Sequence, residues 1–334
     1  MPEGHSVHRI ARQFAANFVG KSAEITSPQG RFAEGAEQLN GQIMTDARAV
    51  GKQMFLEFEE RDWLRVHLGI YGAWDFAGDV RVDPTIQIHG YTPGHSKLGQ
   101  TGEHSRPSGA APIDNEGEDS VASIGAPRRA RVRMAEHDKE SEDDRAFPPE
   151  PVGQVRVRLL TDTVCADLRG PTACEVLTPE GVNKVLQRLG PDPANANTTA
   201  ERDRFIDRAI AKRTPIGLVL MDQSVLAGIG NVYRAELLFR AGIDPHTPAN
   251  TISRSTLEVL WDDWAHLLDV GITVGQMITI DGLEGKAYEL ALRDRDERHW
   301  VYKLEGTPCK RCGTNITLEE MGNRKLYWCA GCQS

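Results

Sequence analysis

Four cysteines near the end of the chain have the spacing of a metal site. They form two Cys-x2-Cys pairs, Cys309 with Cys312 and Cys329 with Cys332, and sixteen residues separate the pairs. Four thiolates on two turns can converge tetrahedrally on Zn²⁺, at about 2.3 Å each. Because protein ligands would fill every position, such a zinc is structural and leaves no open site for catalysis. We therefore expect one structural Zn²⁺ per chain, which supplies much of the folding free energy of the segment around it.

Residues 321–328, between the two cysteine pairs, are typical of a β-hairpin. The turn contains Gly322 and Asn323 and would present Arg324. A closed zinc site would hold this hairpin rigidly, so its arginine could be aimed at a phosphate or a reacting sugar. The alternative is an ordinary charged residue in a solvated turn.

A second feature is the glycine-rich segment before a predicted helix. Gly228 and Gly230 permit unusual backbone angles, and Asn231 is expected to be the N-cap of the helix that follows. Backbone N–H groups at such a helix start form an anion site. No strand precedes the glycines, which disfavours a dinucleotide-binding fold. A simple tight turn between packed helices is the alternative.

The third feature is the beginning of the chain. Met1 precedes the small residue Pro2, which favours removal of Met1 and would leave a free proline amine. An α-amino group has a pKa of about 7.7–8.0, and the positive end of a following helix would lower it. Such an amine can attack an electrophilic carbon and form an iminium. Glu3 beside it, and Lys52 in a strand-like segment, could transfer protons.

The composition excludes several classes of protein. With 40% hydrophobic and 26% charged residues among 334, the chain is typical of globular proteins of two or three domains. No run of about 18 apolar residues exists, so a membrane-spanning helix is excluded. The N-terminus lacks the pattern of a secretion signal, and six cysteines are too few for a disulfide scaffold. We therefore expect a cytoplasmic protein.

The negative charge of the chain is concentrated in one segment. The formal net charge is −9, and residues 101–150 hold 12 acidic against 7 basic residues. This segment is rich in Pro, Gly and Ser, so it cannot bury enough apolar surface to offset the entropy lost on ordering. We predict a disordered insertion over about 90–149, with a long surface loop as the alternative.

The remaining pattern indicates the elements that position these residues. Apolar spacings of three and four predict a helix from Ser6 towards Gly20. Strand-like segments follow at 24–26, 42–48, 53–59 and 63–76, and residues 155–168 are typical of a hairpin. After 178 we expect helices, at 179–189, 201–211, 215–221, 232–241 and 253–280, and then short strands around the cysteines.

The predicted fold class is therefore a multidomain α+β protein. An N-terminal helix and an antiparallel β-sandwich or barrel occupy 1–177, with the acidic insertion hanging from one loop. A helical domain follows at 178–299, and a four-cysteine zinc finger occupies 300–334.

Taken together, these motifs resemble the formamidopyrimidine-DNA glycosylase/endonuclease VIII family. The resemblance covers nearly the whole chain except about 80–150, and the opening is similar to actinobacterial members of the endonuclease VIII branch. It rests on Pro2-Glu3-Gly4, Gly51-Lys52, the segment from Met221-Asp222-Gln223 to Ala235-Glu236, and the four-cysteine finger with Arg324. The helical domain would then be a helix-two-turn-helix domain.

The resemblance implies a chemical role for four residues. Pro2 would be the Schiff-base nucleophile at C1′ of a damaged nucleotide, and Glu3 the proton donor. Lys52 would serve β-elimination and Arg324 δ-elimination. The implied activity is that of a bifunctional DNA glycosylase and abasic-site lyase acting on oxidised bases, oxidised pyrimidines above all. Oxidised purines are one alternative, and a damage-sensing DNA-binding protein without catalysis is the other.

The resemblance also implies residues that hold damaged double-stranded DNA. Asn231 would bind the phosphates beside the lesion, and Ile70 and Tyr71 would fill the space left by a base flipped out of the duplex. We expect a monomer associated with the nucleoid. Two departures concern Ser6, where relatives often have glutamate, and Gly69, where the bacterial pattern has an amide side chain.

An acidic chain that binds DNA must gather its basic groups on one face. The candidates for that face are Lys52, Arg188, Arg234, Arg311, Arg324 and Lys325.

Overall fold

The computed structural model describes residues 2–86, 123–126 and 147–334. Its contacts divide the chain into two compact units. The N-terminal unit comprises Met1–Gln187 with Ile272–Gly275, and the C-terminal unit comprises Arg188–Gly271 with Gln276–Ser334. The domain boundaries at 177 and 299 stay predictions.

One sheet of the N-terminal unit has four antiparallel strands. Their order is β2 (Met44–Val50), β3 (Gln53–Phe58), β4 (Trp63–His67) and β9 (Ala173–Leu177). Strands β2, β3 and β4 follow one another along the chain through short turns, whereas β9 comes from far along the chain and pairs with β4. Three of these strands were expected, and β9 was not.

The second sheet of this unit has five antiparallel strands. Their order is β1 (Glu24–Thr26), β7 (Val155–Leu160), β8 (Val164–Arg169), β5 (Ala73–Gly78) and β6 (Ser123–Gly125). The expected hairpin is confirmed as β7 and β8. Their pairing runs from Leu160 opposite Cys165, beside the turn, to Val155 opposite Arg169.

Strand β6 corrects the prediction of a continuous disordered insertion over 90–149. Ser123–Gly125 pair with β5, and Ile124 is fully buried. The Ser123 hydroxyl donates a hydrogen bond to the Asp75 carboxylate. The buried Ile124 and the hydrogen bond of Ser123 tie this short segment to the sheet. Residues 90–122 and 127–146 of the predicted insertion lie outside the described residues.

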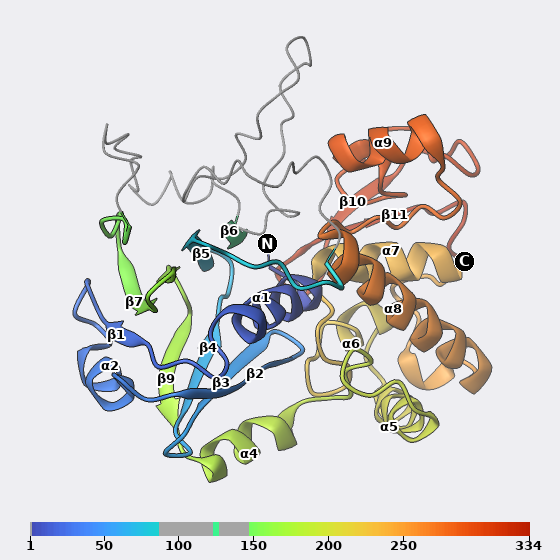
Figure 1. Cartoon of the computed structure of the whole chain (residues 1–334). Helices are drawn as coiled ribbons and strands as arrows, with labels where there is room; N and C mark the ends of the chain where they lie inside the picture. Colours follow the sequence, from blue (N-terminus) through green and yellow to red (C-terminus); the bar gives the residue numbers. More distant parts are fainter. Residues whose placement is uncertain (1, 87–122, 127–146) are drawn as a thin grey trace. The chain divides into compact units, whose positions relative to one another are not determined.

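Helix α1 (Gly4–Asn17) organises the apolar core of the N-terminal unit. It packs against β2 and β3, as Figure 1 shows. The ring of Phe14 meets Trp74 edge-on, with ring centroids 4.7 Å apart, and also contacts Phe76 and Phe18. The predicted helix is confirmed, although it begins at Gly4 rather than at Ser6.

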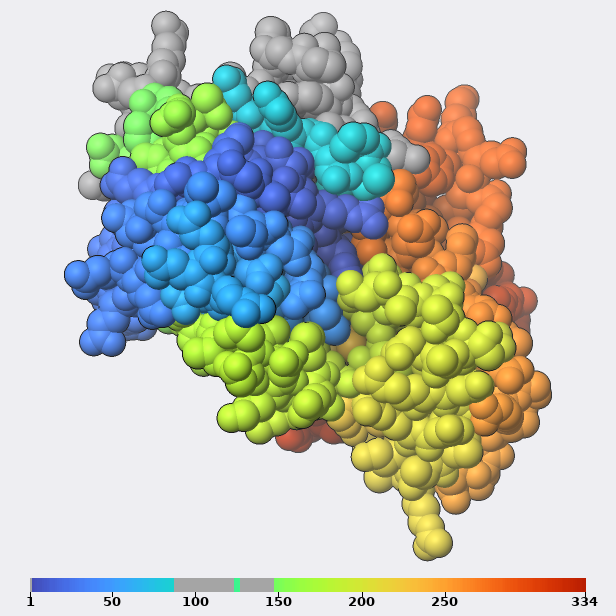
Figure 2. All heavy atoms as spheres, turned by 60° about the horizontal axis from the view of Figure 1, so that its bottom comes forward, coloured from blue at the N-terminus to red at the C-terminus, as the bar shows by residue number. Residues whose placement is uncertain are grey.

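Two further helices complete this unit. Helix α2 (Ala33–Leu39) was not predicted, because its seven residues are too few to give a clear helical period. Helix α4 (Pro179–Arg188) packs through Val182 on Phe55 and Trp63 of the four-stranded sheet. In Figure 2 the yellow-green α4 lies directly against the blue segment that contains these strands.

The C-terminal unit is mainly helical. Its α-helices are α5 (Thr199–Ile210), α6 (Ile216–Val219), α7 (Asn231–Ala241), α8 (Arg254–Val274, of which the last residues fall in the N-terminal unit) and α9 (Gly285–Arg293). Short 3-10 helices occupy Ala249–Thr251 and Arg295–Glu297. Helix α8 ends at Val274 and not at 280, because Gly275 follows with a φ of 86°. Helix α9 was not predicted.

A two-stranded hairpin and the four cysteines complete the C-terminal unit. Strands β10 (Thr317–Glu320) and β11 (Lys325–Trp328) pair antiparallel, where the sequence predicted a hairpin. The α+β fold class is therefore confirmed, with antiparallel sheets, a helical region and a cysteine cluster near the C-terminus.

Among the described residues, no helix combines the length and the apolar character needed to cross a membrane.

Candidate functional site

Pro2 and Glu3 are both buried at the start of α1. Glu3 is the N-cap residue, with an extended backbone, and its carbonyl accepts hydrogen bonds from the N–H groups of Ser6 and Val7. The carboxylate itself does not cap the helix. Both residues therefore lie at the positive end of the α1 dipole, where an amine is harder to protonate.

His5 and Arg9 lie under the first turns of α1, and both are fully buried. Burial and, next, the charge of Arg9 lower the pKa of His5 to about 3, so its imidazole is neutral at physiological pH. Arg9 donates hydrogen bonds to the carbonyls of Ile272 (2.8 Å) and Thr273 (3.3 Å). Neither residue was predicted from the sequence. Nothing in the sequence distinguishes them, because α1 also carries His8, Arg12 and Gln13.

Lys52 lies in the two-residue turn between β2 and β3. Val50 pairs with Gln53 across this turn, and Gly51 takes a φ of 58°. The strand next to β3 brings His67 opposite Gln53. Burial lowers the pKa of His67, and the positive charge of Lys52 lowers it further. Lys52 is thus close enough to His67 for their charges to interact.

Ile70 and Tyr71 form the tip of the loop between β4 and β5. Their exposed fractions are 42% and 47%, high values for large apolar side chains. The loop is tight, because Gly69 has a φ of 67° and a Cβ there would lie 1.8 Å from the hydroxyl of Thr172. A Cβ on Gly72 would lie 2.4 Å from a backbone oxygen. Glycine is therefore required at both places, and the loop presents two apolar side chains on a constrained backbone.

The start of α7 differs from the prediction. Gly230, and not Asn231, is the N-cap residue. The Asn231 side chain instead donates a hydrogen bond to the carbonyl of Lys325 (2.8 Å) and accepts one from Arg234 (2.6 Å). Asn231 therefore joins the glycine-rich segment to the β10–β11 hairpin.

Arg234 is not part of an exposed basic face. Its side chain is 1% exposed. The guanidinium donates hydrogen bonds to the carbonyls of Gly217 (3.4 Å), Met321 (3.3 Å) and Lys325 (3.1 Å). The helical position of Arg234, one turn after Asn231, turns it inward. It holds both ends of the hairpin turn to the helices.

The hairpin turn presents Arg324 to solvent. Gly322 and Asn323 have φ angles of 63° and 58°, the pair of positive values typical of a type I′ turn. The N–H of Met321 donates to the carbonyl of Arg324 across the turn (2.9 Å). Arg324 and Lys325 are both exposed.

The four cysteines fit a tetrahedral metal site. Their Sγ atoms all lie within 4.8 Å of one another. The distances are 3.8 Å from Cys309 to Cys332 and 3.5 Å from Cys312 to Cys329. Zn–S bonds of about 2.3 Å in a tetrahedron put the sulfur atoms about 3.8 Å apart, so the arrangement suits zinc.

Neighbouring side chains hold this cluster in place. The Gln333 amide accepts a hydrogen bond from the N–H of Cys329 and donates one to the carbonyl of Ile243, both at 2.9 Å. The Arg311 guanidinium lies over the rings of Phe239 (4.6 Å) and Trp300 (4.8 Å). The cluster is thus joined to α7 and to the loop that follows it.

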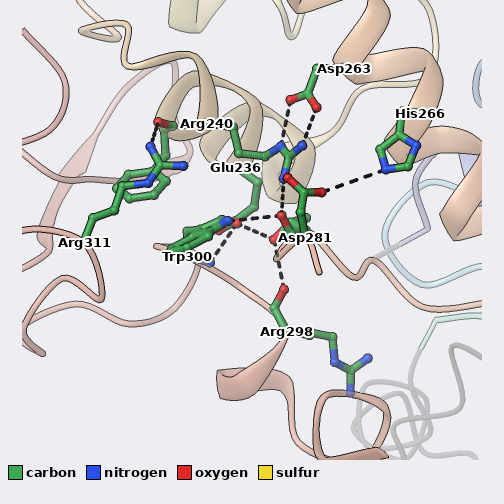
Figure 3. Close-up of polar contacts among 10 residues, drawn as sticks. Glu236, Arg240, Asp263, His266, Asp281, Arg298, Trp300 and Arg311 are labelled. Carbon is green, nitrogen blue, oxygen red and sulfur yellow. Dashed lines mark hydrogen bonds and ion pairs between the residues drawn. The ribbon is translucent and has the colours of Figure 1, made fainter. Parts of the chain in front are cut away.

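Glu236 is a fully buried carboxylate on α7, shown in Figure 3. It accepts hydrogen bonds from the N–H groups of Trp300, Val301 and Tyr302 (2.8–2.9 Å) and from the hydroxyl of Thr279. Burial raises the pKa of Glu236, and these donors only partly offset the effect. The carboxylate fixes the segment that leads into the cysteine cluster.

Gln276 differs from the other buried polar groups of the C-terminal unit. Its side chain is 1% exposed, and neither its amide nitrogen nor its amide oxygen has a hydrogen-bond partner in the described structure. An unsatisfied buried amide is costly and rare. Nothing in the sequence marks this glutamine, which follows the end of α8.

The predicted site residues therefore form two groups. Pro2, Glu3, Lys52, Ile70 and Tyr71 belong to the N-terminal unit, where the first two are adjacent at the start of α1. The C-terminal unit joins Asn231, the hairpin with Arg324 and the four cysteines through direct hydrogen bonds and short chain segments. Arg188 is exposed at the end of α4, where the C-terminal unit begins.

Three family models match the chain in the expected order. Residues 1–106 match the formamidopyrimidine-DNA glycosylase N-terminal domain, and 189–281 match the H2TH domain of the same family. Residues 306–334 match the zinc finger found in FPG and IleRS.

Full-length relatives carry endonuclease 8 names. Endonuclease 8 1 of Mycobacterium tuberculosis is 34% identical over 334 residues, and endonuclease 8 of Escherichia coli is 27% identical over 343. Both alignments cover all of each chain. A formamidopyrimidine-DNA glycosylase of Parasynechococcus marenigrum is 34% identical, but over 44% of this chain.

Solved structures share the fold. Lactococcus lactis Fpg in complex with DNA containing an abasic site superposes with a TM-score of 0.64, at 17% identity over 99% of each chain. A MutM complex with carbocyclic 8-oxo-G DNA gives 0.65 at 18% identity, over the whole of each chain.

Proposed function

The chain belongs to the formamidopyrimidine-DNA glycosylase/endonuclease VIII family, which repairs oxidised bases in DNA, and from this we propose a bifunctional enzyme. It removes an oxidised base and then cleaves the abasic strand, acting as a monomer on damaged double-stranded DNA. Oxidised pyrimidines are the proposed substrates, because the full-length relatives are endonuclease 8 proteins, whereas the formamidopyrimidine-DNA glycosylase quoted above matches less than half of the chain.

The buried Pro2–Glu3 pair at the start of α1 is the observation that carries this proposal. Once Met1 is removed, the Pro2 amine attacks C1′ of the damaged nucleotide. The bond from C1′ to the base breaks, and its electron pair leaves with the base, which takes up a proton from Glu3. The proline nitrogen then loses its proton, and the bond from C1′ to the ring oxygen opens to form the iminium, while that oxygen takes up a proton. The α1 dipole favours the neutral, nucleophilic amine.

Strand cleavage would use Lys52 and Arg324. Lys52 serves β-elimination, which breaks the bond to the 3′ phosphate, and Arg324 serves δ-elimination on the other side. The charge of Lys52 lowers the pKa of His67, which supports a place for Lys52 near this histidine. The type I′ turn supports a fixed place for the backbone of Arg324.

The proposal assigns DNA contacts to both units. Asn231 uses one amide N–H for Lys325, and an amide has two, so the second can face a phosphate. Ile70 and Tyr71 would fill the place of the flipped base, which their exposure on a tight loop supports. Arg188 would contact the DNA backbone.

Cys309, Cys312, Cys329 and Cys332 would hold one structural Zn²⁺. When bound, the zinc crosslinks the ends of the segment that contains the hairpin, and it has no open position for chemistry. The residues themselves keep Arg324 and Asn231 on one rigid framework.

Borohydride trapping on abasic DNA tests the nucleophile. Reduction of the iminium should give a stable protein–DNA crosslink with the mature protein. An N-terminal extension should abolish the crosslink, whereas the same extension at the C-terminus, as the matched control, should leave it intact. Robust trapping by the N-terminally extended protein would contradict the role of Pro2.

A panel of duplexes tests the substrate class. Single oxidised pyrimidines, 8-oxoguanine and a preformed abasic site would be compared at equal enzyme concentration. We expect faster excision of the pyrimidines. Faster excision of 8-oxoguanine would assign the same chemistry to oxidised purines instead.

A further inference from the structure

His246 lies between two carboxylates in the C-terminal unit. It belongs to the loop after α7, and its Nδ1 is 2.7 Å from Oδ1 of Asp244 on the same loop. Its Nε2 is 2.6 Å from Oε1 of Glu319 on β10. The ring also packs edge-on against Trp328 of β11, with ring centroids 5.3 Å apart. The imidazole therefore joins the loop to both strands of the hairpin.

Among the described residues, helix α6 also contacts this loop, and its four residues carry no charge. The N-terminus of α6 contacts the loop through backbone hydrogen bonds, from Ile216 to Thr247 and from Gly217 to Pro245. Asp244 and Glu319 are thus the charged groups that face the ring. Asp244 is fixed in turn, because its Oδ1 also accepts a hydrogen bond from the backbone N–H of His246 (2.8 Å).

Only the imidazolium satisfies both carboxylates. A neutral imidazole has one N–H, so one of its nitrogens would direct a lone pair at a carboxylate oxygen. Within the described residues, Oε1 of Glu319 is buried and accepts no hydrogen bond of good geometry, so its contact with Nε2 of His246 is an ion pair that requires the charged ring. Burial lowers the pKa of His246, but the hydrogen bond to Asp244 and the charge of Glu319 outweigh it and raise the pKa above 6.5.

The hairpin is consequently held at two places of different chemistry. Its turn is held by Arg234, which is buried and always charged. Strand β10 is held by His246, whose charge depends on pH. We infer that His246 is a positioning residue: its imidazolium orients the β10–β11 hairpin and thereby Arg324, so that δ-elimination depends on the charge of His246. The inference rests on the proposed role of Arg324.

The direction of the pH dependence follows from the raised pKa. The folded state binds the proton more tightly than the unfolded state, so the stabilisation is complete below about pH 6.5. It is lost as the pH rises through the raised pKa of His246. Arg324 should therefore be best positioned at the acidic end of the range and less well positioned above it.

The first test measures the ionisation of His246 by NMR in the zinc-loaded full chain. Glu319→Gln should lower the pKa of His246, because it removes one of the two negative charges. Glu258→Gln on α8, which removes a negative charge that pairs with Arg254, is the matched control and should leave the pKa of His246 unchanged. An unchanged pKa in Glu319→Gln would overturn the inference.

The second test measures the products from a preformed abasic site between pH 6 and 9. The ratio of δ- to β-elimination should fall in the wild type by about two- to fivefold, because partly exposed ion pairs have modest energies. The pH at the midpoint of this fall in the ratio should equal the pKa of His246 found by NMR. His246→Gln and Glu319→Gln should give a low ratio without this step, whereas His266→Gln should follow the wild type.

Zinc content and urea midpoints show whether each variant is folded. If His246→Gln does not fold, Glu319→Gln provides the test instead. If the ratio of δ- to β-elimination in His246→Gln changes with pH in the same way as in the wild type, the positioning role is overturned. Absence of strand cleavage in every protein, the wild type included, would instead contradict the proposed lyase function and leave the NMR result intact.

Discussion

The two units position their predicted site residues by different physical means. In the N-terminal unit, α1 is fixed by an apolar core in which Phe14 meets Trp74 and Phe76, and glycines shape the Ile70–Tyr71 loop. In the C-terminal unit, buried charges such as Arg234 and Glu236 join the helices to the hairpin and the cysteines. Apolar packing is insensitive to pH and metal, whereas ionised groups and thiolates are not. The N-terminal unit also holds largely buried ion pairs, Arg158 with Asp167 and Arg169 with Asp75, so dependence on a metal is what should set the C-terminal unit apart.

Removal of zinc should have the largest effect on structure, and it should affect the C-terminal unit while leaving the N-terminal unit folded. Cys309→Ser should disorder the cysteine segment and weaken binding to abasic-site duplexes, because structural zinc contributes about 10–16 kcal/mol in finger peptides. The NMR signals of α1 and its core should persist. Cys174→Ser is the control, since burial raises the pKa of that thiol to about 12 and it lies outside the cluster. Normal DNA binding by metal-free protein would contradict the structural role.

Glu3→Gln tests whether the N-terminal unit carries the chemistry. Excision of an oxidised base should fall by about 10²–10⁴-fold, the usual contribution of general acid catalysis. Cleavage of a preformed abasic site should change far less, because it needs no protonation of a departing base. Glu34→Gln, in the first turn of α2, should leave both rates unchanged. Equal small losses on both substrates would count against Glu3.

Glu236→Ala should destabilise the C-terminal unit. Three backbone N–H groups lose their acceptor at about 1–3 kcal/mol each, so the free energy of unfolding should fall by at least about 3 kcal/mol. Urea unfolding measures this loss, and Glu258→Ala on α8, which removes an ion pair with the exposed Arg254, should cost less than about 1 kcal/mol. Similar losses in the two variants would show that the carboxylate is dispensable.

The pH dependence of Glu236 has a definite sign. Because its pKa is raised in the folded state, its contribution is most favourable below the ordinary glutamate pKa of about 4.3 and is lost as the pH rises through the raised value. The stability of Glu236→Gln relative to the wild type should therefore increase from pH 4 to pH 7. A constant difference in urea midpoint would contradict the raised pKa.

Two buried glutamines of the C-terminal unit should give the smallest changes in stability, and the changes should have opposite signs. Gln276 has no partner for its amide in the described structure, whereas both amide atoms of Gln333 are hydrogen-bonded. Gln276→Met should raise the free energy of unfolding by about 1–2 kcal/mol, and Gln333→Met should lower it by a similar amount. If both substitutions change the melting temperature in the same direction, the difference in hydrogen bonding between the two glutamines does not determine their stability effects.

The parts predicted from the sequence have local signals. The apolar spacing of α1, the alternation in β7 and β8, and the two Cys-x2-Cys pairs each lie within a short stretch, and the structure has all three. The missed elements depend on distant partners. Strand β9 exists because it pairs with β4, and its half-buried residues carry no clear alternation.

The same distinction applies to the candidate site. Asn231 was predicted as an N-cap from residue type alone, but its amide is used by Lys325, ninety-four positions along the chain. Arg234 was predicted on the basic face because of its charge, but its side chain is buried and donates to carbonyls that are distant in the sequence, such as that of Met321. Residue type predicts which chemistry a side chain can do, whereas the tertiary partners determine which of these it does.

The hydrogen bonds of Arg9 also bear on how such a protein can be divided or recombined. Ile272–Gly275 belong to the N-terminal unit although they follow most of the C-terminal unit along the chain. A fragment ending at Gln187 would lose the Ile272 and Thr273 carbonyls, and with them two acceptors of a buried guanidinium. No single cut therefore yields an intact N-terminal unit, and a chimera that replaces residues 188–334 must retain compatible carbonyls at 272 and 273.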